Sequence, residues 1–192
     1  KKALTQARRK IARELGAKED EIIFTASGTE SCNLAILGVA RKYRANGKHV
    51  ITSKIEHHAV LHPFQELEKE GFEVPYLEVG EDGIVKPEDL EKVLRPETIL
   101  VSIMYANNEI GTLQPIREIG NILKGHKAFF HTDACQAAGY LDLNVANLGV
   151  DLMSLSGYKF YGPKGIGILY KSHNVEIEPL LLGGEQEFGL RP

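Results

Sequence analysis

Short apolar runs alternate with longer amphipathic segments along most of the chain. Runs typical of buried strands lie at residues 21–25, 49–53, 72–77, 98–104, 128–132, 150–155 and 165–170. Segments with helical periodicity lie at residues 1–15, 28–40, 56–70, 87–94 and 115–124. Strands that alternate with helices in this way form a mostly parallel sheet with helices on both faces. The pattern therefore predicts an α/β fold.

Small and polar residues follow directly after several of the predicted strands. The segments concerned are Ser27–Ser31, Glu56–Val60, Asn107–Thr112, Asp133–Gln136 and Ser156–Lys159. Ligands of open α/β sheets bind outside the carboxyl ends of the strands. The sequence therefore predicts one site at that edge of the sheet.

Lys159 lies between two predicted strands, in the segment Ser156-Gly157-Tyr158-Lys159. Most lysines in loops are solvated surface charges. A lysine held between two strands can instead be desolvated, which favours the neutral amine that attacks a carbonyl to form a Schiff base. The carbonyl we expect here is that of pyridoxal phosphate (PLP).

Asp133 stands at the end of an apolar strand, 26 residues before Lys159. A buried carboxylate is costly unless it has a cationic or hydrogen-bonded partner, and a protonated pyridine nitrogen would be one. PLP chemistry needs both residue types, because the lysine binds the cofactor and moves the substrate proton while the acid keeps the ring nitrogen protonated. This pair favours a PLP site.

The segment after the first predicted strand has two interpretations. Ser27 is a good helix N-cap, and Glu30 three residues later completes a capping-box pattern. These residues could simply start a helix. A glycine and hydroxyl groups at a helix N-terminus are also typical of a phosphate site, because backbone N–H groups and the helix dipole favour an anion.

Histidines and asparagines at two other strand ends also leave alternatives. His57, His58 and His62 could suggest a metal site, but adjacent residues diverge on a helix and no further ligand has suitable spacing. We expect no metal, and His57 could instead cover an aromatic cofactor and shuttle protons. Asn107 and Asn108 could cap a loop or belong to the site.

Composition narrows the classes of function. The chain has 192 residues, of which 43% are hydrophobic and 26% charged, as in a globular domain with one core. Its net charge of -3 gives no basic footprint, so we expect no direct nucleic-acid or membrane partner. Two cysteines without CxxC spacing argue against a disulfide framework and a structural zinc site. We expect a cytoplasmic protein.

Six short blocks resemble, in order, motifs of the cysteine desulfurases of the class V aminotransferase family. The blocks are Ser27–Ser31, Glu56–Val60, Asn107–Gly111, Asp133–Gln136, Ser156–Lys159 and Gly183–Glu187. The resemblance implies the large domain of PLP fold type I. It also implies a reaction that takes sulfur from L-cysteine, leaving L-alanine and an enzyme persulfide. That sulfur feeds iron-sulfur cluster assembly or thio-modification of nucleic acids.

The resemblance also implies roles for the matching residues. Lys159 resembles the Schiff-base lysine, Asp133 the partner of the ring nitrogen, and His57 the catalytic histidine that stacks on the ring. Gln136 resembles the donor to the ring hydroxyl, and Asn108 the asparagine near that hydroxyl and the substrate. The phosphate-binding positions are matched by Gly28, Thr29 and Ser156.

Some positions depart from the family pattern. Tyr158, which we count among the cofactor-binding residues, stands where many members have a histidine that contacts the phosphate. Phe188 and Pro192 stand where some members carry polar residues. The family's persulfide cysteine and substrate-binding arginine lie beyond the last of the six blocks. Cys135 resembles a position filled by various small residues, and we expect Cys32 to be a core thiol.

The two ends of the chain suggest a fragment. The first helix has no N-cap residue, and the last residues stand within a glycine-rich motif. We expect a single PLP-binding large domain over residues 1–192, incomplete at both ends, without the C-terminal small domain and inactive alone. The resemblance implies that the full-length protein is a homodimer that passes sulfur to an acceptor or scaffold protein.

Three other functions remain open at this stage. A related class V lyase or transaminase, such as a selenocysteine lyase, would differ in its products. A non-catalytic PLP-binding remnant would show cofactor colour without turnover. A dinucleotide-binding domain fits the sheet, but no G-x-G-x-x-G follows the first strand.

Overall fold

One sheet forms the centre of the molecule in the computed structural model, which describes residues 2–192. The predicted helix start at Lys1 lies outside the described residues. The strands are β1 (Ile22–Thr25), β2 (His49–Ser53), β3 (Tyr76–Leu77), β4 (Thr98–Ser102), β5 (Phe129–Asp133), β6 (Leu152–Ser156) and β7 (Gly167–Lys171). Their spatial order in the described chain is β1-β7-β6-β5-β4-β2-β3. Six of these strands run in the same direction, and β7 runs opposite to them between β1 and β6. The sheet is therefore mostly parallel, as predicted.

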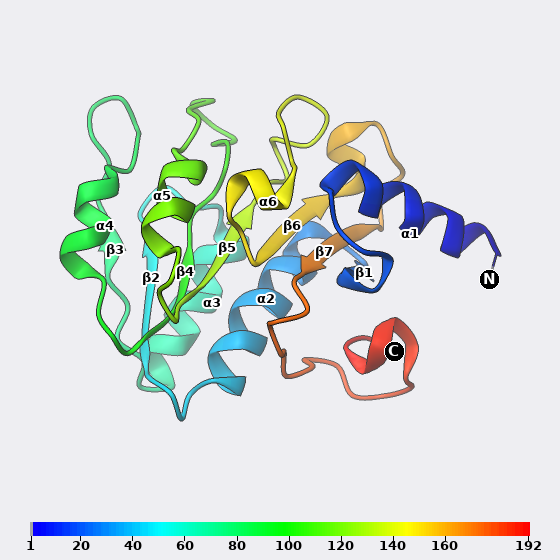
Figure 1. The fold of residues 1–192 in the computed structure, drawn as a ribbon, viewed down its shortest axis with the longest axis horizontal. Helices are drawn as coiled ribbons and strands as arrows, with labels where there is room; N and C mark the ends of the chain where they lie inside the picture. The colour runs from blue at the N-terminus through cyan, green and yellow to red at the C-terminus, as the bar shows by residue number, and fades with distance from the viewer. Residues whose placement is uncertain (1) are drawn as a thin grey trace.

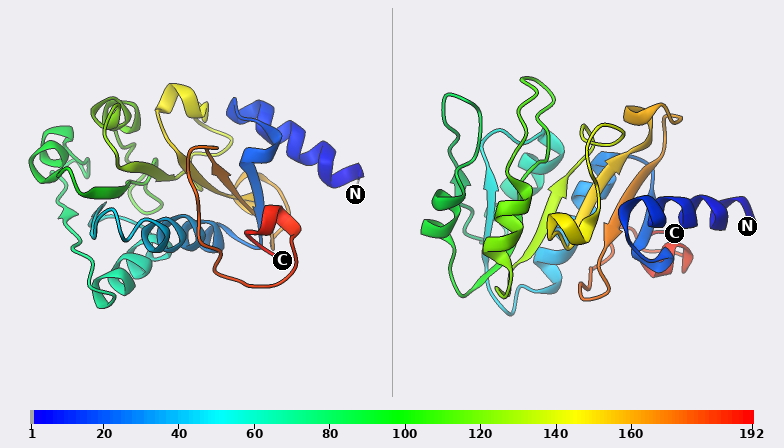
Figure 2. Two further views of the ribbon diagram at one scale, coloured as in Figure 1. Left: turned by 60° about the horizontal axis from the view of Figure 1, so that its bottom comes forward. Right: turned by 45° about the horizontal axis from the view of Figure 1, so that its top comes forward.

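Helices cover both faces of this sheet, as the alternating pattern predicts. The helices are α1 (Lys2–Leu15), α2 (Gly28–Lys42), α3 (His58–Lys69), α4 (Pro87–Val93), α5 (Ile116–Leu123) and α6 (Val145–Leu148), with short 3-10 helices η1 (Glu19–Glu21), η2 (Gly157–Phe160) and η3 (Gln186–Gly189). Figure 1 shows the helices in front of and behind the strands, and Figure 2 separates the two layers. Helices α1, α4, α5 and α6 cover one face, while α2 and α3 cover the other.

The central strands are buried on both faces. Along β6, Met153 and Leu155 pack under the α1, α4, α5 and α6 layer, and Leu152 packs under α2 and α3. A strand covered on both sides cannot show the simple alternation of apolar and polar residues, which explains its continuous apolar run. This packing fixes the strand ends, which carry the polar segments.

The strand expected at residues 72–77 is only partly formed, since the chain before Tyr76 pairs with β2 through an isolated bridge between Glu73 and His49. Only Tyr76 and Leu77 form β3. The chain before them lacks a continuous ladder because Pro75 has no N–H to donate, although its carbonyl accepts a hydrogen bond from the Thr52 N–H. Phe72 is buried in the core between the sheet and helices α2 and α3, directly after the end of α3. Its apolar side chain therefore packs in this core without belonging to a strand.

The last residues fold back onto the edge strand β1. Glu187 Oε2 accepts a hydrogen bond from the Phe24 N–H at 2.7 Å, and Glu187 Oε1 pairs with Arg8 Nη2 at 2.7 Å. Arg8 also donates to the Ile22 carbonyl and lies over the rings of Phe24 and Phe188. Glu187 and Phe188 both have positive φ, which non-glycine residues rarely adopt, so these contacts hold an unusual backbone conformation.

Candidate active site

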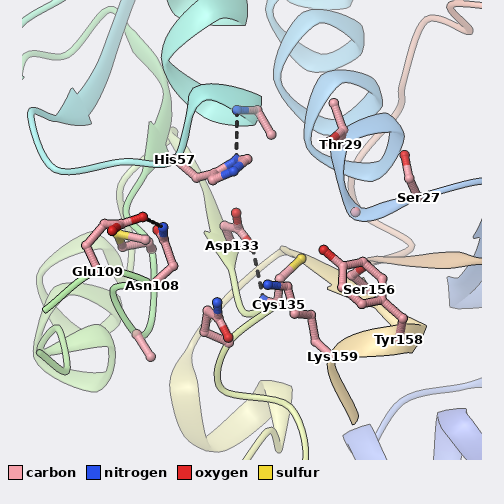
Figure 3. Close-up of a pocket in the computed structure, with 15 residues that line it drawn as sticks. Ser27, Thr29, His57, Asn108, Glu109, Asp133, Cys135, Ser156, Tyr158 and Lys159 are labelled. Atoms are coloured by element: carbon pink, nitrogen blue, oxygen red, sulfur yellow. Dashed lines mark hydrogen bonds between the residues drawn. The ribbon is translucent and has the colours of Figure 1, made fainter. Parts of the chain in front are cut away.

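A cavity of about 290 Å³ opens where β2, β4, β5 and β6 end (Figure 3). All nine residues that the sequence nominates for a cofactor line it. They are Gly28, Thr29, His57, Asn108, Asp133, Gln136, Ser156, Tyr158 and Lys159. Segments far apart in the sequence therefore meet at one edge of the sheet, as the strand-end argument predicts.

The N-terminus of α2 forms one wall of the cavity. Ser27 is the N-cap, and its Oγ accepts a hydrogen bond from the Glu30 N–H at 3.1 Å. Glu30 Oε2 accepts from the Ala26 N–H at 2.8 Å, one residue earlier than in a standard capping box. The first-turn N–H groups of Gly28 and Thr29 have no acceptor within the helix, so they are available to an anion.

Gly28 lets the N-terminus of α2 lie close to the opposite wall of the cavity. A Cβ at this position would lie 2.6 Å from the Sγ of Cys135 and 3.1 Å from the Cβ of Ser156. Both of those side chains also line the cavity. The N-terminus of α2 can therefore pack this closely against Cys135 and Ser156 only because the residue is glycine. The phosphate interpretation of this segment fits the geometry, and the helix-cap interpretation holds as well.

Asp133 and Lys159 reach the cavity from neighbouring elements. Asp133 is the last residue of β5 and is only 6% exposed, and its Oδ1 accepts a hydrogen bond from the Cys135 N–H at 3.0 Å. Lys159 lies in η2, with its Nζ 5.1 Å from the centre of the Tyr158 ring. Within residues 2–192, neither side chain forms an ion pair with the other or with any further residue. The acid and the amine are therefore both free to meet a ligand.

His57 is held at the N-terminus of α3. It is the N-cap of that helix, and its Nδ1 accepts a hydrogen bond from the Ala59 N–H at 3.0 Å (Figure 3). A neutral imidazole that accepts through Nδ1 carries its proton on Nε2. The backbone thus sets both the position and the tautomer of this ring.

The two asparagines have different roles in the loop after β4. Asn107 is buried, and its Oδ1 accepts from the N–H groups of Glu109 and Ile110 at 2.9 and 3.0 Å. Its Nδ2 donates to the Ile55 carbonyl at 2.9 Å, so it organises the loop. Asn108 lines the cavity and donates to Glu109 Oε1 at 2.6 Å. The loop-cap interpretation fits Asn107, and the site interpretation fits Asn108.

His58 and His62 lie outside the cavity. Their rings stack at 4.9 Å with an interplanar angle of 12°, and they border a separate surface groove. Across residues 2–192, no group of three or more His, Cys, Asp and Glu side chains is arranged to hold a metal ion. The same part of the chain contains no helix with the length and apolar character needed to cross a bilayer.

Neither cysteine has the environment of a reactive thiolate. Cys32 is fully buried in the core, as expected, and burial raises the pKa of its thiol. Cys135 lines the cavity, but burial and the charge of Asp133 raise the pKa of its thiol as well. A thiolate nucleophile needs the opposite shift. Both residues are free thiols.

Three buried polar side chains form a hydrogen-bonded row in the sheet beneath the cavity, and the sequence gives little sign of this row. His131 Nδ1 contacts Ser102 Oγ at 2.7 Å, and its Nε2 contacts Ser154 Oγ at 2.9 Å, so the ring joins β4, β5 and β6. Burial lowers the pKa of His131 to about 3, so the imidazole is neutral. The histidine alternates with Asp133 along β5, but only the fold reveals its two serine partners.

We expect the free energy of unfolding to fall as the pH is lowered from about 6.5 to about 3. In this range the unfolded chain protonates His131 and the folded chain does not, so the unfolded state binds more protons and acid favours it. His131→Gln should remove a dependence of up to about 1.4 kcal/mol per pH unit, measured by urea denaturation. The surface substitution His62→Gln is the control, and equal pH slopes in wild type and His131→Gln would contradict the argument.

The comparisons with known proteins agree with the fold. The family model described as "Aminotransferase class-V" matches residues 1–190. The chain belongs to the class V aminotransferase family, whose members use PLP. Within that family it is similar to proteins named cysteine desulfurase IscS, and the predicted resemblance is confirmed.

Two of these relatives show the extent of the similarity. The protein from Dictyoglomus turgidum is 58% identical over 96% of this chain and 47% of its own length. The protein from Methanosarcina thermophila is 57% identical over 97% of this chain and 46% of its own length. The chain therefore spans about half the length of the relatives that it matches.

Solved structures show the same architecture. A structure described as SspA in complex with cysteine has a TM-score of 0.95 and 48% identity, covering 99% of this chain and 55% of that one. A structure described as a NifS-like protein has a TM-score of 0.95 and 43% identity, covering 98% of this chain and 52% of that one. The predicted PLP fold type I is confirmed.

Proposed function

We propose that this protein is a PLP-dependent cysteine desulfurase that converts L-cysteine to L-alanine and passes the sulfur to an enzyme thiol. One observation carries the proposal: a single cavity brings together an unpaired lysine, an unpaired acid and the open N-terminus of a helix. The names of its relatives and the cysteine complex of a similar structure support this choice of substrate.

The residues around the cavity fit PLP at both of its ends. The N-terminus of α2 at Gly28 and Thr29, together with Ser156 and Tyr158, would hold the phosphate group. Asp133 would pair with the ring nitrogen, since no cation of the described chain neutralises this carboxylate. The side chains that would contact the ring face and the ring hydroxyl are His57, Asn108 and Gln136.

Three side chains would carry the chemistry of the cavity. Bound PLP supplies an electron sink for the substrate carbon. Lys159 would hold the cofactor covalently and then move a proton to and from the substrate carbon. Asp133 would hold a proton on the ring nitrogen, and His57 would cover the ring and exchange a proton through Nε2.

The thiol that takes the sulfur is neither of the two cysteines of this chain. Cys32 has no access to the cavity from the core, and the raised pKa of Cys135 keeps that thiol protonated. We propose that another cysteine of the full protein accepts the sulfur and that an acceptor or scaffold protein then receives it. The destination would be iron-sulfur cluster assembly or thio-modification.

Product analysis tests this proposal. The full-length protein, including the cysteine that would accept the sulfur, would be incubated with PLP and L-cysteine, and alanine, sulfide and pyruvate would be measured. Alanine formed in step with sulfide supports desulfuration. Pyruvate or amino transfer instead of alanine would assign a related lyase or transaminase activity, and cofactor colour without any product would assign a PLP-binding role.

Replacing Gly28 with alanine is expected to raise the Kd for PLP, because the new Cβ must displace Cys135 Sγ or Ser156 Cβ. Overpacking of this kind costs roughly 1–3 kcal/mol. The free protein can relieve this cost by a shift of the first turn of α2, whereas a bound phosphate would hold that turn in place, so the cost would fall on the bound form and weaken the affinity by about 5- to 150-fold. The change would be measured by absorbance titration with PLP. Cys135→Gly in the Gly28→Ala background should recover part of the loss, and full wild-type affinity in Gly28→Ala alone would argue against the phosphate site.

We propose that the protein acts as a homodimer in the cytoplasm. Ile110, Leu113 and Tyr140 border a shallow groove beside the cavity and are 62%, 50% and 70% exposed. Large exposed apolar side chains gathered at one place are typical of an interface. The free thiols support a reducing compartment. Light scattering would test the dimer, and Leu113→Glu should shift it toward monomer.

A further inference from the structure

Glu56 is a buried acid next to the catalytic histidine candidate, and it forms no ion pair with any other residue in the described part of the chain. Its side chain is only 5% exposed and accepts hydrogen bonds through Oε1 from Ser53 Oγ at 2.6 Å and from the Met104 N–H at 2.9 Å. Its Oε2 is buried and has no hydrogen-bond partner in the described chain. The two bonds to Oε1 connect β2, the loop before α3 and the end of β4.

These contacts reach the segment that carries His57. Met104 and His57 both line the cavity, and Glu56 connects them through one backbone hydrogen bond and one peptide bond. Asn107 makes a second connection between the same two segments through the Ile55 carbonyl. The loop that carries His57 is therefore connected to the segment after β4 at two adjacent residues, Ile55 and Glu56.

We propose that Glu56 is a positioning residue: its buried carboxyl group fixes the loop after β2 against β4 and thereby holds the His57 ring over the cavity. This inference rests on the proposed function. In this proposal Glu56 does not contact substrate or cofactor. The residue acts only through His57 and the cavity wall.

Burial keeps Glu56 a neutral acid below about pH 8. Burial raises the pKa of Glu56 to about 8, although the hydrogen bonds from Ser53 and Met104 oppose this shift, and the charge of Asp133 adds to it. The other titratable groups that face it are His57 beside it and Cys32 on α2, whose thiol pKa is raised partly by the charge of Glu56. An ionised Glu56 would place a charge on the unpaired Oε2, so water must enter or the side chain must leave.

Ionisation of Glu56 should therefore loosen His57 and disfavour the cofactor. It would also add a second negative charge beside Asp133 and near the proposed phosphate site. If only the neutral form of Glu56 is competent, the apparent Kd for PLP rises about tenfold one pH unit above the pKa. A glutamine at this position keeps the accepting oxygen and cannot ionise.

The experiment compares wild type with Glu56→Gln, with the surface substitution Glu91→Gln as the matched control. In the protein without PLP, NMR titration of the His57 ring should show an inflection near pH 8 in wild type and Glu91→Gln, and none in Glu56→Gln. In PLP titrations, the ratio of the wild-type Kd to the Glu56→Gln Kd should rise about tenfold between pH 7 and pH 9.

Two further variants keep the test independent of folding defects. Glu56→Ala removes both hydrogen bonds to Oε1 and should broaden or shift the His57 signals at every pH. Ser53→Ala removes one donor to Oε1 and should produce a smaller shift in the same direction. Unchanged His57 signals in Glu56→Ala and Ser53→Ala, or an identical pH dependence in wild type and Glu56→Gln, would overturn the inference. Failure of the wild-type protein to bind PLP would overturn the proposed function, while the NMR titration still decides the role of Glu56.

Discussion

Replacing Lys159 with alanine should abolish covalent attachment of PLP and lower desulfurase activity by about 10⁴-fold, the upper range for a positioned acid–base group. The expectation follows from the position of this amine, which lies in the cavity and forms no ion pair with a carboxylate of residues 2–192. Borohydride reduction of the wild-type complex followed by peptide mass spectrometry should place the cofactor on Lys159.

A second lysine provides the matched control for this experiment. Lys164 is exposed and follows Lys159 by five positions. Lys164→Ala should retain the visible absorption band and the modified peptide. A cofactor adduct on Lys164 or on Lys54 would show that the covalent residue has been misassigned.

Replacing Asp133 with asparagine should slow the reaction by about 10²–10³-fold while leaving much of the PLP affinity in place, because an amide cannot hold the ring nitrogen protonated. Asparagine can still accept the hydrogen bond from the Cys135 N–H, so the end of β5 should keep its conformation. The measurements are the rate of alanine formation and the Kd for PLP.

A surface acid separates the local effect from a general loss of negative charge. Asp89 lies on α4 and pairs with Lys92 at the surface, and Asp89→Asn should leave both measurements unchanged. Near-normal alanine formation by Asp133→Asn would rule out the proposed role of this carboxylate.

The cavity could be predicted from the sequence because parallel strands bring their carboxyl ends to the same edge. Residues such as Thr29 and Lys159 are far apart in the chain, yet their positions directly after strands sufficed to bring them together. The cavity residues Met104 and Ala106 escaped notice because apolar residues after a strand look like more of the core. Their position directly after β4 was the available signal.

Other features depend on contacts that no local pattern contains. The burial of Glu56 depends on Ser53 and Met104, and the two serines around His131 come from different strands. The antiparallel direction of β7 has a local cause, since the connection from β6 is too short for the crossover that parallel strands require. Pro75 was visible in the sequence and should have shortened the predicted strand at residues 72–77.

The ion pair of Arg8 and Glu187 has a consequence for solubility. Strand β1 lies at the edge of the sheet, where its outward N–H and C=O groups could pair with a strand of another molecule. Glu187 takes the outward N–H of Phe24, and Arg8 takes the outward carbonyl of Ile22. Two side chains thus occupy the hydrogen bonds that an eighth strand would need, and this edge is protected from the strand-to-strand stacking that leads to aggregation.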